Sequence, residues 1–396
     1  MAKRILNRLR QRPGAVLLII FLFHALNNLV IVARDRLPFD ITQAWLFASS
    51  GEMLRSISQR DPASFMSALI GSHPPLHRLV SLPFYLMFGY SPKVAVLSVL
   101  PAALVLIISM YVIGKELQDS DMGLLAAGLT MLLPGVFILS RTYWTEFTLM
   151  ATVALSLAVM LKTKGFSHRG YTFAFGMSIG LGLLAKWTFP VFAVGPCLLY
   201  VYQSYRKIGS KNLKRESVRR GSWLLLSVVL GLLLASLWYL QNPELLTGDL
   251  KRITLIDQVF IVRDDSHTPE VRKEGDARRI FSTENILFYV RELYSLQLKP
   301  VFFIMGLASG LYLLITKHRA ALFPTPWFLL PYAIFTFGIT DAKAARFILP
   351  YLPAFALIIA IAATSLKPRY RDAAIAILLA GGLLQFFALS SFSFTF

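Results

Sequence analysis

Apolar residues occur in runs of about 20 along most of the chain, and short polar links separate the runs. A helix rises about 1.5 Å per residue, so about 20 apolar residues cross a hydrocarbon core about 30 Å thick. Eleven runs predict transmembrane helices, over residues 14–33, 94–114, 122–139, 147–161, 171–185, 189–205, 222–240, 300–316, 324–339, 347–366 and 373–390. The pattern therefore predicts an all-α polytopic membrane protein with a single membrane domain over residues 1–396.

The apolar segment 76–88 differs from these runs because it has only thirteen residues. As a helix it would be roughly 20 Å long, which is too short to cross the bilayer. Leaving it out puts five basic links on the same side as the basic N-terminus; these links contain Lys115, Lys162, Lys164, Arg169, Arg206, Lys207, Lys211, Lys214, Arg215, Arg219, Arg220, Lys317, Arg319, Lys367, Arg369 and Arg371. Because Lys and Arg accumulate in cytoplasmic links, we expect a cytoplasmic N-terminus and an interfacial or re-entrant helix over 76–88.

Three larger segments then lie outside the membrane: a first loop over 34–93, a tight turn over 140–146 and a large loop over 241–299. Inside the first loop, apolar spacing predicts a helix over 41–58, and Asp61-Pro62 predicts the start of a second, short helix. Both helices are expected to lie along the membrane surface. The large loop includes a strand-like stretch over 259–262.

The composition also requires a bilayer, since 56% of the 396 residues are hydrophobic and the mean hydropathy is +0.61. A formal net charge of +19 would suggest nucleic acid as the partner of a soluble chain. Here the cations lie in the links, so we interpret the charge as membrane topology and expect no nucleic-acid partner. The single cysteine, Cys197, lies in an apolar run and excludes a disulfide framework. The sequence has no P-loop or internal repeat, which argues against an ATP-driven pump.

Ionisable residues gather at the ends of the predicted spans on the external side. They are Asp40, Glu146, Lys186, Asp341, Lys343 and Arg346. Ionisable groups close to the membrane core are costly to keep there, so they are candidates for a functional site by default. The topology alone predicts that these residues share one depth in the membrane.

Five short motifs follow one another in the sequence on this external side. They are Phe39-Asp40-Ile41-Thr42, His73-Pro74-Pro75-Leu76, Ser140-Arg141 with Glu146 five residues after Arg141, a glycine-rich segment that ends at Lys186, and Arg346-Phe347-Ile348-Leu349-Pro350-Tyr351-Leu352-Pro353. In these motifs the chain resembles the GT-C class of membrane glycosyltransferases, in the branch of the protein O-mannosyltransferases and the lipid A aminoarabinose transferases. The resemblance extends over residues 14–200 and 346–353.

This resemblance implies transfer of a sugar from a polyprenyl-phosphate donor, with inversion, on the external (periplasmic) face of the inner (plasma) membrane. A hydroxyl acceptor needs a carboxylate to accept its proton, and Asp40 is our candidate for this general base. The acceptor is a lipid, a protein or a glycan, and the loop 241–299 is expected to select it. Membrane lipids are the remaining partners. The sugar itself is not determined by these motifs.

The departing phosphate needs cations or hydrogen-bond donors in a site of low dielectric constant. The candidates for this role are Lys186, Arg346, His73 and Arg141. Glu146 is the second acid, which would orient the acceptor, bind a divalent cation or pair with Arg141. The motifs imply no definite cofactor, and dependence on a divalent cation stays open. The chain departs from the family pattern at Ile41, where relatives often have an acid, and at Glu146, where many have Asp.

Several alternatives remain at this point. Asp40 would serve equally well as a solvated loop acid or as the cap of the helix that starts at Ile41. Lys186 and Arg346 would serve equally well by extending from the span ends to lipid headgroups, as cations at such positions commonly do. Asp341, Lys343 and Arg346 would serve equally well as a salt-bridged turn without a catalytic role. Two other functions use the same charges: a transporter or flippase of lipid-linked sugars, and a non-catalytic partner in a glycan-assembly complex.

Overall fold

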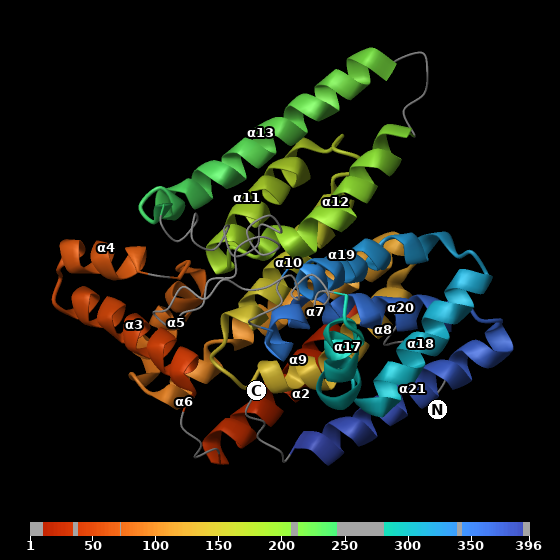
Figure 1. Ribbon diagram of the computed structural model, residues 1–396, viewed down its shortest axis with the longest axis horizontal. Helices are drawn as coiled ribbons and strands as arrows, with labels where there is room; N and C mark the ends of the chain where they lie inside the picture. The colour runs from red at the N-terminus through yellow and green to blue at the C-terminus, as the bar shows by residue number, and fades with distance from the viewer. Residues whose placement is uncertain are drawn as a thin grey trace.

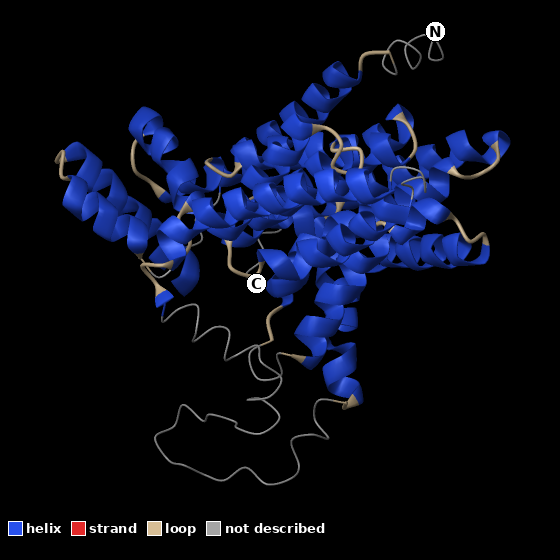
Figure 2. Ribbon diagram, turned by 90° about the horizontal axis from the view of Figure 1, so that it is seen from above, coloured by secondary structure: helices blue, strands red, loops and turns tan. Residues whose placement is uncertain are grey.

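The structure is a computed structural model that describes residues 11–34, 39–71, 73–206, 213–243, 281–338 and 343–390. Its described elements are all helices, which join into one bundle from which α11 (Arg169–Ala185), α12 (Phe189–Arg206) and α13 (Leu213–Tyr239) extend to one side (Figure 1, Figure 2). The all-α class is therefore confirmed for this part of the chain. The strand-like stretch 259–262 lies outside the described residues.

Each of the eleven apolar runs has a helical counterpart. They are α2 (Pro13–Arg34), α6 with α7 (Pro92–Leu97, Leu100–Leu117), α8 with α9 (Ser120–Leu132, Pro134–Leu139), α10 (Thr145–Lys162), α11 (Arg169–Ala185), α12 (Phe189–Arg206), α13 (Leu213–Tyr239), α18 (Lys299–Ile315), α19 (Pro324–Phe337), η4 with α20 (Ala345–Tyr351, Leu352–Thr364) and α21 (Pro368–Ser390). Among the described residues, seven helical stretches are long and apolar enough to cross a membrane, and α8 and α18 are shorter apolar helices. The number of eleven crossings stays a prediction.

The first predicted loop contains three helices at the expected places: α3 (Ile41–Ser58), α4 (Pro62–Ile70) and α5 (Leu76–Phe88). Asp61 caps α4, and Pro62 occupies its first turn, where its missing N–H costs no hydrogen bond. The inner face of α5 is polar and fully buried at Arg78 and Ser81. In Figure 1 these helices, with α6, form a group at one side of the bundle. The remaining elements are α17 (Thr283–Glu292), η2 (Leu293–Gln297) and η3 (Arg319–Leu322).

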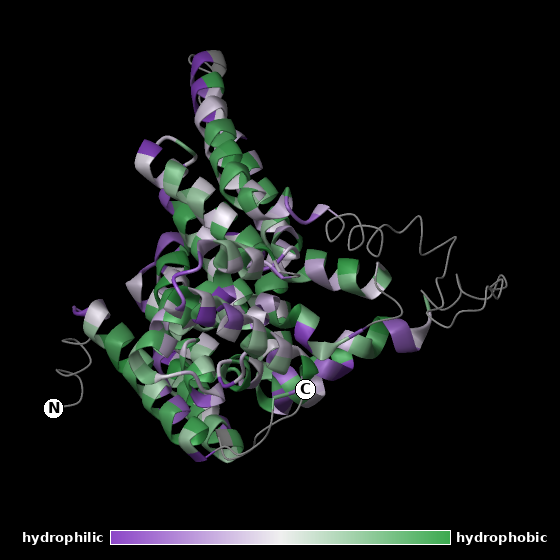
Figure 3. Ribbon diagram, turned by 90° about the vertical axis from the view of Figure 1, so that its left-hand side faces the viewer, coloured by the Kyte–Doolittle hydropathy of each residue, from purple (hydrophilic) through white to green (hydrophobic). Residues whose placement is uncertain are grey.

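The helices differ strongly in how far neighbouring helices enclose them. In α10 and in the η4–α20 segment, 83% of an 18-residue stretch is buried, against 22% in α13 and 11% in α21. The exposed residues of α13 are mostly leucines, such as Leu225, Leu233 and Leu237. In Figure 3, α13 extends highest and is hydrophobic along its length and hydrophilic at its tip. We therefore identify α10 and α20 as the core of the bundle and α13 and α21 as helices with lipid-facing surfaces.

Glycine permits the close contact between α11 and α13. Gly176 and Gly180 are four residues apart on α11 and face the backbone of Ser227 and Gly231 on α13. A Cβ atom at either position of α11 would collide with that backbone, at 2.8 Å in the case of Gly180. Small residues at this spacing allow two membrane helices to approach closely. This contact attaches the outer helix α13 to the helix that ends at Lys186.

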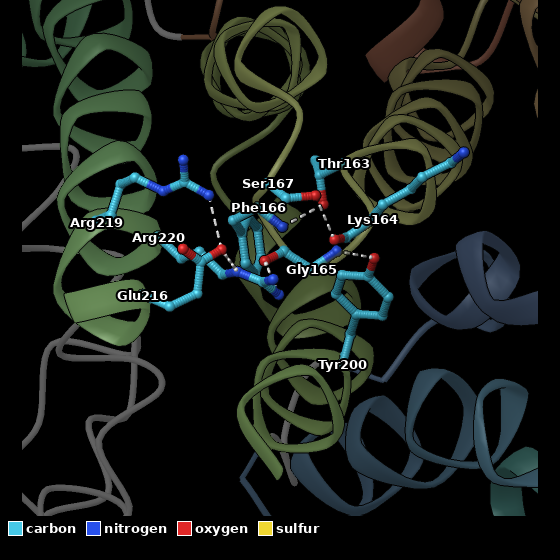
Figure 4. A network of polar contacts seen from close by, with 9 residues as sticks. All are labelled: Thr163, Lys164, Gly165, Phe166, Ser167, Tyr200, Glu216, Arg219 and Arg220. Atoms are coloured by element: carbon cyan, nitrogen blue, oxygen red, sulfur yellow. Dashed lines mark hydrogen bonds and ion pairs between the residues drawn. The ribbon is translucent and has the colours of Figure 1, made fainter. Parts of the chain in front are cut away.

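A tight turn joins α10 to α11 on the side of the basic links. Lys164, Gly165 and Phe166 all have positive φ angles, of 50°, 70° and 62°. The turn is held by side chains: Thr163 Oγ1 accepts a hydrogen bond from the Phe166 N–H at 3.1 Å, and Tyr200 OH accepts one from the Gly165 N–H at 2.9 Å (Figure 4). These bonds compensate for a backbone conformation that costs energy at non-glycine residues.

Candidate active site

Three charged residues from three separate elements meet at the opposite end of α10. Glu146 lies in the first turn of α10 and is 1% exposed. Its Oε1 accepts a hydrogen bond from Lys186 Nζ at 2.7 Å, and Arg346 Nε lies 3.7 Å from the same oxygen. Lys186 follows the last residue of α11, and Arg346 lies at the start of η4. The positions of Glu146 and Lys186 are favourable locally, because a helix start attracts an anion and a helix end attracts a cation.

Aromatic rings enclose the two cations of this cluster. The Arg346 guanidinium lies 4.0 Å from the centroid of the buried Trp144 ring. The Phe347 ring lies 5.6 Å from Lys186 Nζ and 5.5 Å from Arg346 Cζ. Arg346 Nε is buried and makes no hydrogen bond within the described residues. The cluster therefore has two cations for one carboxylate, in surroundings where their field is weakly screened.

Asp40 is the N-cap of α3. Its Oδ1 accepts hydrogen bonds from the backbone N–H groups of Thr42 at 2.9 Å and Gln43 at 3.0 Å. Its Oδ2 accepts a third bond from the Gln43 side-chain amide at 2.7 Å. The capping alternative from the sequence is therefore confirmed, and the role of Asp40 as a base stays a prediction. The two roles of Asp40, helix cap and base, are compatible, since capping leaves a lone pair of the carboxylate free to accept a proton.

His73 lies between the first-loop helices and the charged cluster. Its ring packs against Trp45 of α3, with 4.6 Å between the ring centroids. Burial lowers the pKa of His73 to about 4, and the positive charges of Lys186 and Arg78 lower it further, against the opposing effect of Glu146. His73 is therefore neutral near pH 7 and would meet a phosphate as a hydrogen-bond donor.

The backbone of His73 is fixed by a residue that the sequence analysis did not identify. Arg78 on α5 is fully buried and donates to the carbonyl oxygens of His73 and Ala68, each at 2.7 Å, and to Ser49 Oγ at 2.7 Å. It thus ties α3, α4 and the Pro74-Pro75 turn together. The signal that could have identified Arg78 is its place inside an otherwise apolar segment, where an ionisable residue is a candidate by default.

Arg141 is turned toward α2. Its guanidinium donates to the side-chain oxygens of Asn27 and Asn28, the latter at 3.2 Å, and lies over the Phe137 ring at 5.0 Å. Burial lowers the pKa of Arg141 to about 10, so it stays charged near neutral pH. The described partners of Glu146 are Lys186 and Arg346, and a role of Arg141 in phosphate binding stays a prediction.

Lys343 and Arg346 face different neighbours. Lys343 Nζ donates to the carbonyl oxygen of Asn285 at 2.9 Å and lies over the rings of Phe288 and Tyr289. Burial lowers the pKa of Lys343 to about 8. Asp341 lies outside the described residues. Within the described part of the chain, no three His, Cys, Asp or Glu side chains come together as a metal site.

Comparison with known proteins identifies the fold. The family model described as dolichyl-phosphate-mannose-protein mannosyltransferase matches residues 72–239. The structure of ArnT from Cupriavidus metallidurans bound to undecaprenyl phosphate superposes with a TM-score of 0.60 at 18% identity, over 93% of this chain and 64% of that one. The chain has the GT-C fold. The resemblance to this class of membrane glycosyltransferases is thereby confirmed.

A more distant GT-C structure agrees with this result. Archaeal oligosaccharyltransferase AglB from Archaeoglobus fulgidus, in complex with an inhibitory peptide and a dolichol-phosphate, superposes with a TM-score of 0.54 at 14% identity. The match covers 95% of this chain and 54% of AglB. The chain thus spans less than two thirds of the length of these solved structures. No curated protein sequence matches it.

Proposed function

We propose that the protein transfers a glycosyl group from a polyprenyl-phosphate-linked donor to an acceptor hydroxyl, on the external (periplasmic) face of the inner membrane. The observation that carries this proposal is the convergence of Lys186 and Arg346 on the buried Glu146. Two cations facing one carboxylate leave a positive charge, and the buried Arg346 Nε still has hydrogen-bonding capacity. A phosphate group supplies the matching charge and acceptor oxygens.

Lys186 and Arg346 would stabilise the negative charge that develops on the departing polyprenyl phosphate. Their stabilising effect on this charge is large, because aromatic rings rather than water surround them. His73, neutral near pH 7, would add a hydrogen bond. Arg141, whose described contacts are with α2 and with the rings of Phe137 and Phe386, would supply a further guanidinium for the phosphate oxygens.

Asp40 would act as the general base. The acceptor oxygen attacks the anomeric carbon from the face opposite the phosphate, and the bond between that carbon and the phosphate oxygen breaks with inversion. Polyprenyl phosphate leaves with the bonding electrons, and the hydroxyl proton moves to Asp40. Oδ1 already accepts two N–H bonds and Oδ2 accepts one, so the free lone pair on Oδ2 is the one that receives this proton.

The matched structures support a lipid-phosphate donor, since one contains undecaprenyl phosphate and the other a dolichol-phosphate. A long apolar tail contributes binding energy away from the reacting atoms, which helps to hold the sugar beside the base. The acceptor stays within the classes of lipid, protein and glycan.

The test measures release of polyprenyl phosphate from a panel of polyprenyl-phosphate sugars by the purified protein with membrane extract. We expect Asp40→Asn to lower the release rate by about 10²-fold or more while donor binding is retained, because general-base catalysis contributes 10²–10⁴-fold. Asn caps helices as well as Asp does, so α3 keeps its start.

Asp61→Asn provides the matched control. Asp61 caps α4 as Asp40 caps α3, with Oδ1 accepting from the N–H groups of Ala63 and Ser64. We expect this variant to keep wild-type release. Equal effects of the two substitutions would reduce Asp40 to a cap, and donor binding without release by the wild type would contradict the enzyme and favour a transporter.

A further inference from the structure

A single side chain joins Asp40 to the turn that precedes Glu146. Gln43 Nε2 donates to Asp40 Oδ2 at 2.7 Å, and Gln43 Oε1 accepts from the backbone N–H of Tyr143 at 2.8 Å. Gln43 is 9% exposed, and it is 100 residues away from Tyr143 in the sequence. Both ends of the amide are therefore used, one on the proposed base and one on the chain that leads to the charged cluster.

The orientation of this amide is fixed by chemistry. A backbone N–H is only a donor, so Tyr143 must face the oxygen end of Gln43. The NH₂ end is then directed at Asp40 Oδ2. With the two backbone bonds to Oδ1, this leaves Asp40 a single direction in which to accept a further proton.

The turn at the other end of this bridge is itself held from two sides. Tyr143 OH lies 2.8 Å from Ser81 Oγ of α5, and Asn28 of α2 donates to the carbonyl oxygen of Ser140 at 3.2 Å. Gln43 thus connects Asp40 to a fixed support, three residues before Glu146. A bond to a fixed support restrains the carboxylate more than a bond to a mobile side chain.

We propose that Gln43 is a positioning residue that aims the Asp40 carboxylate at the acceptor hydroxyl. This inference rests on the proposed function. It differs from a purely structural role, because it requires the NH₂ end of Gln43 to act on the Asp40 carboxylate itself.

Two substitutions separate the two ends of the amide. Gln43→Glu keeps an acceptor for the Tyr143 N–H but turns a negative charge toward Asp40. Gln43→Lys keeps a donor toward Asp40 but loses the acceptor. We expect the acid limb of the kcat/KM–pH profile for polyprenyl phosphate release to move upward with Glu and downward with Lys, by about one pH unit or more each, as for neighbouring charges in general.

Gln118 gives the matched control at the basic end of the bundle. Its amide also uses both ends, donating to Ser365 Oγ at 3.3 Å and accepting from Thr364 Oγ1 at 2.7 Å. Gln118→Glu and Gln118→Lys should leave the profile unmoved.

A third variant at the bridge, Gln43→Met, loses both hydrogen bonds without adding charge. It should move the acid limb of the profile upward by less than Gln43→Glu does. Thermal unfolding in detergent and donor binding identify any variant that fails to fold.

The results distinguish this inference from the function on which it rests. Opposite shifts with Glu and Lys support it, and if those variants do not fold, an upward shift with Met supports it. Unmoved profiles, or shifts of one sign with Glu and Lys, overturn it when Asp40→Asn still abolishes release. Absence of release by the wild type overturns the proposed function, and this inference with it.

Discussion

Two carboxylates in the described structure lie between two cations, and they do so in opposite ways. Glu216 pairs with arginines three and four residues further along α13, at 2.7 and 2.8 Å, and both partners belong to its own helix. Glu146 is buried and pairs with Lys186 of α11 and Arg346 of η4, at 2.7 and 3.7 Å. The first cluster is made by local sequence, and the second only by packing of distant segments.

The difference indicates what each cluster is for. Ion pairs along one helix near the surface form easily and contribute little to the stability of the protein. Arg220 also donates a hydrogen bond to the carbonyl oxygen of Gly165 in the turn after α10 (Figure 4). Burying a charge costs desolvation energy that an apolar packing would avoid. The partly paired cation of the buried cluster supports our proposal that this cluster binds a phosphate group.

The largest effect is expected from substituting Glu146, and the same substitution at Glu216 should have no effect. Glu146→Gln leaves Lys186 and Arg346 as neighbouring uncompensated cations, so we expect a loss of about 3 kcal/mol in the free energy of unfolding and a drop in release rate of about 10²-fold or more. Glu216→Gln should change neither. The measurements are thermal unfolding in detergent and polyprenyl phosphate release. Equal stability of the two variants would mean that the buried cluster is as dispensable as the surface one.

Two histidines near the Glu146 end of α10 sharpen the comparison through pH. Burial lowers the pKa of His73 and of His77 to about 4 from an ordinary 6.5. The unfolded chain therefore binds protons below pH 6.5 that the folded chain binds only below about 4, so stability is complete above pH 6.5 and falls as the pH falls toward 4. The loss is up to ~3 kcal/mol for each histidine.

Melting temperatures measured between pH 4 and 8 check this expectation. His73→Gln should flatten the dependence between pH 6.5 and 4. A wild-type protein equally stable at pH 4.5 and 7 would contradict the enclosure of the two histidines.

The smallest effect is expected at the basic end. Gly165 has a φ of +70°, and an added Cβ would lie 3.0 Å from Arg220 Nη1 and 3.2 Å from Ser204 Cβ. Gly165→Ala should lower the free energy of unfolding by about 1–2 kcal/mol, because a left-handed conformation is strained in alanine. Release per folded molecule should stay at the wild-type value. Gly310→Ala, where nothing lies within 4 Å, is the control, and lost activity in Gly165→Ala alone would give that turn a functional role.

The elements of the fold could be predicted closely from local sequence. Residues 41–58 and 76–88 form helices with the predicted bounds, and α4 starts at Asp61-Pro62 as expected. These features depend on apolar periodicity, capping side chains and the fixed φ of proline, all of which act within a few residues. The residue types of the candidate site, and their placement at helix ends, come from the same local information.

The partners of those residues were decided by the tertiary structure. Sequence alone left Glu146 free to pair with Arg141, but α2 holds Arg141 while Lys186 and Arg346 approach the carboxylate. For Gln43, local sequence provided only its position three residues after Asp40. Its second hydrogen bond, to Tyr143, forms because α3 packs beside the turn before α10. Hydrogen bonds and ion pairs form over about 3–4 Å. Which groups come within that distance is set by how whole helices pack, and local sequence does not contain that information.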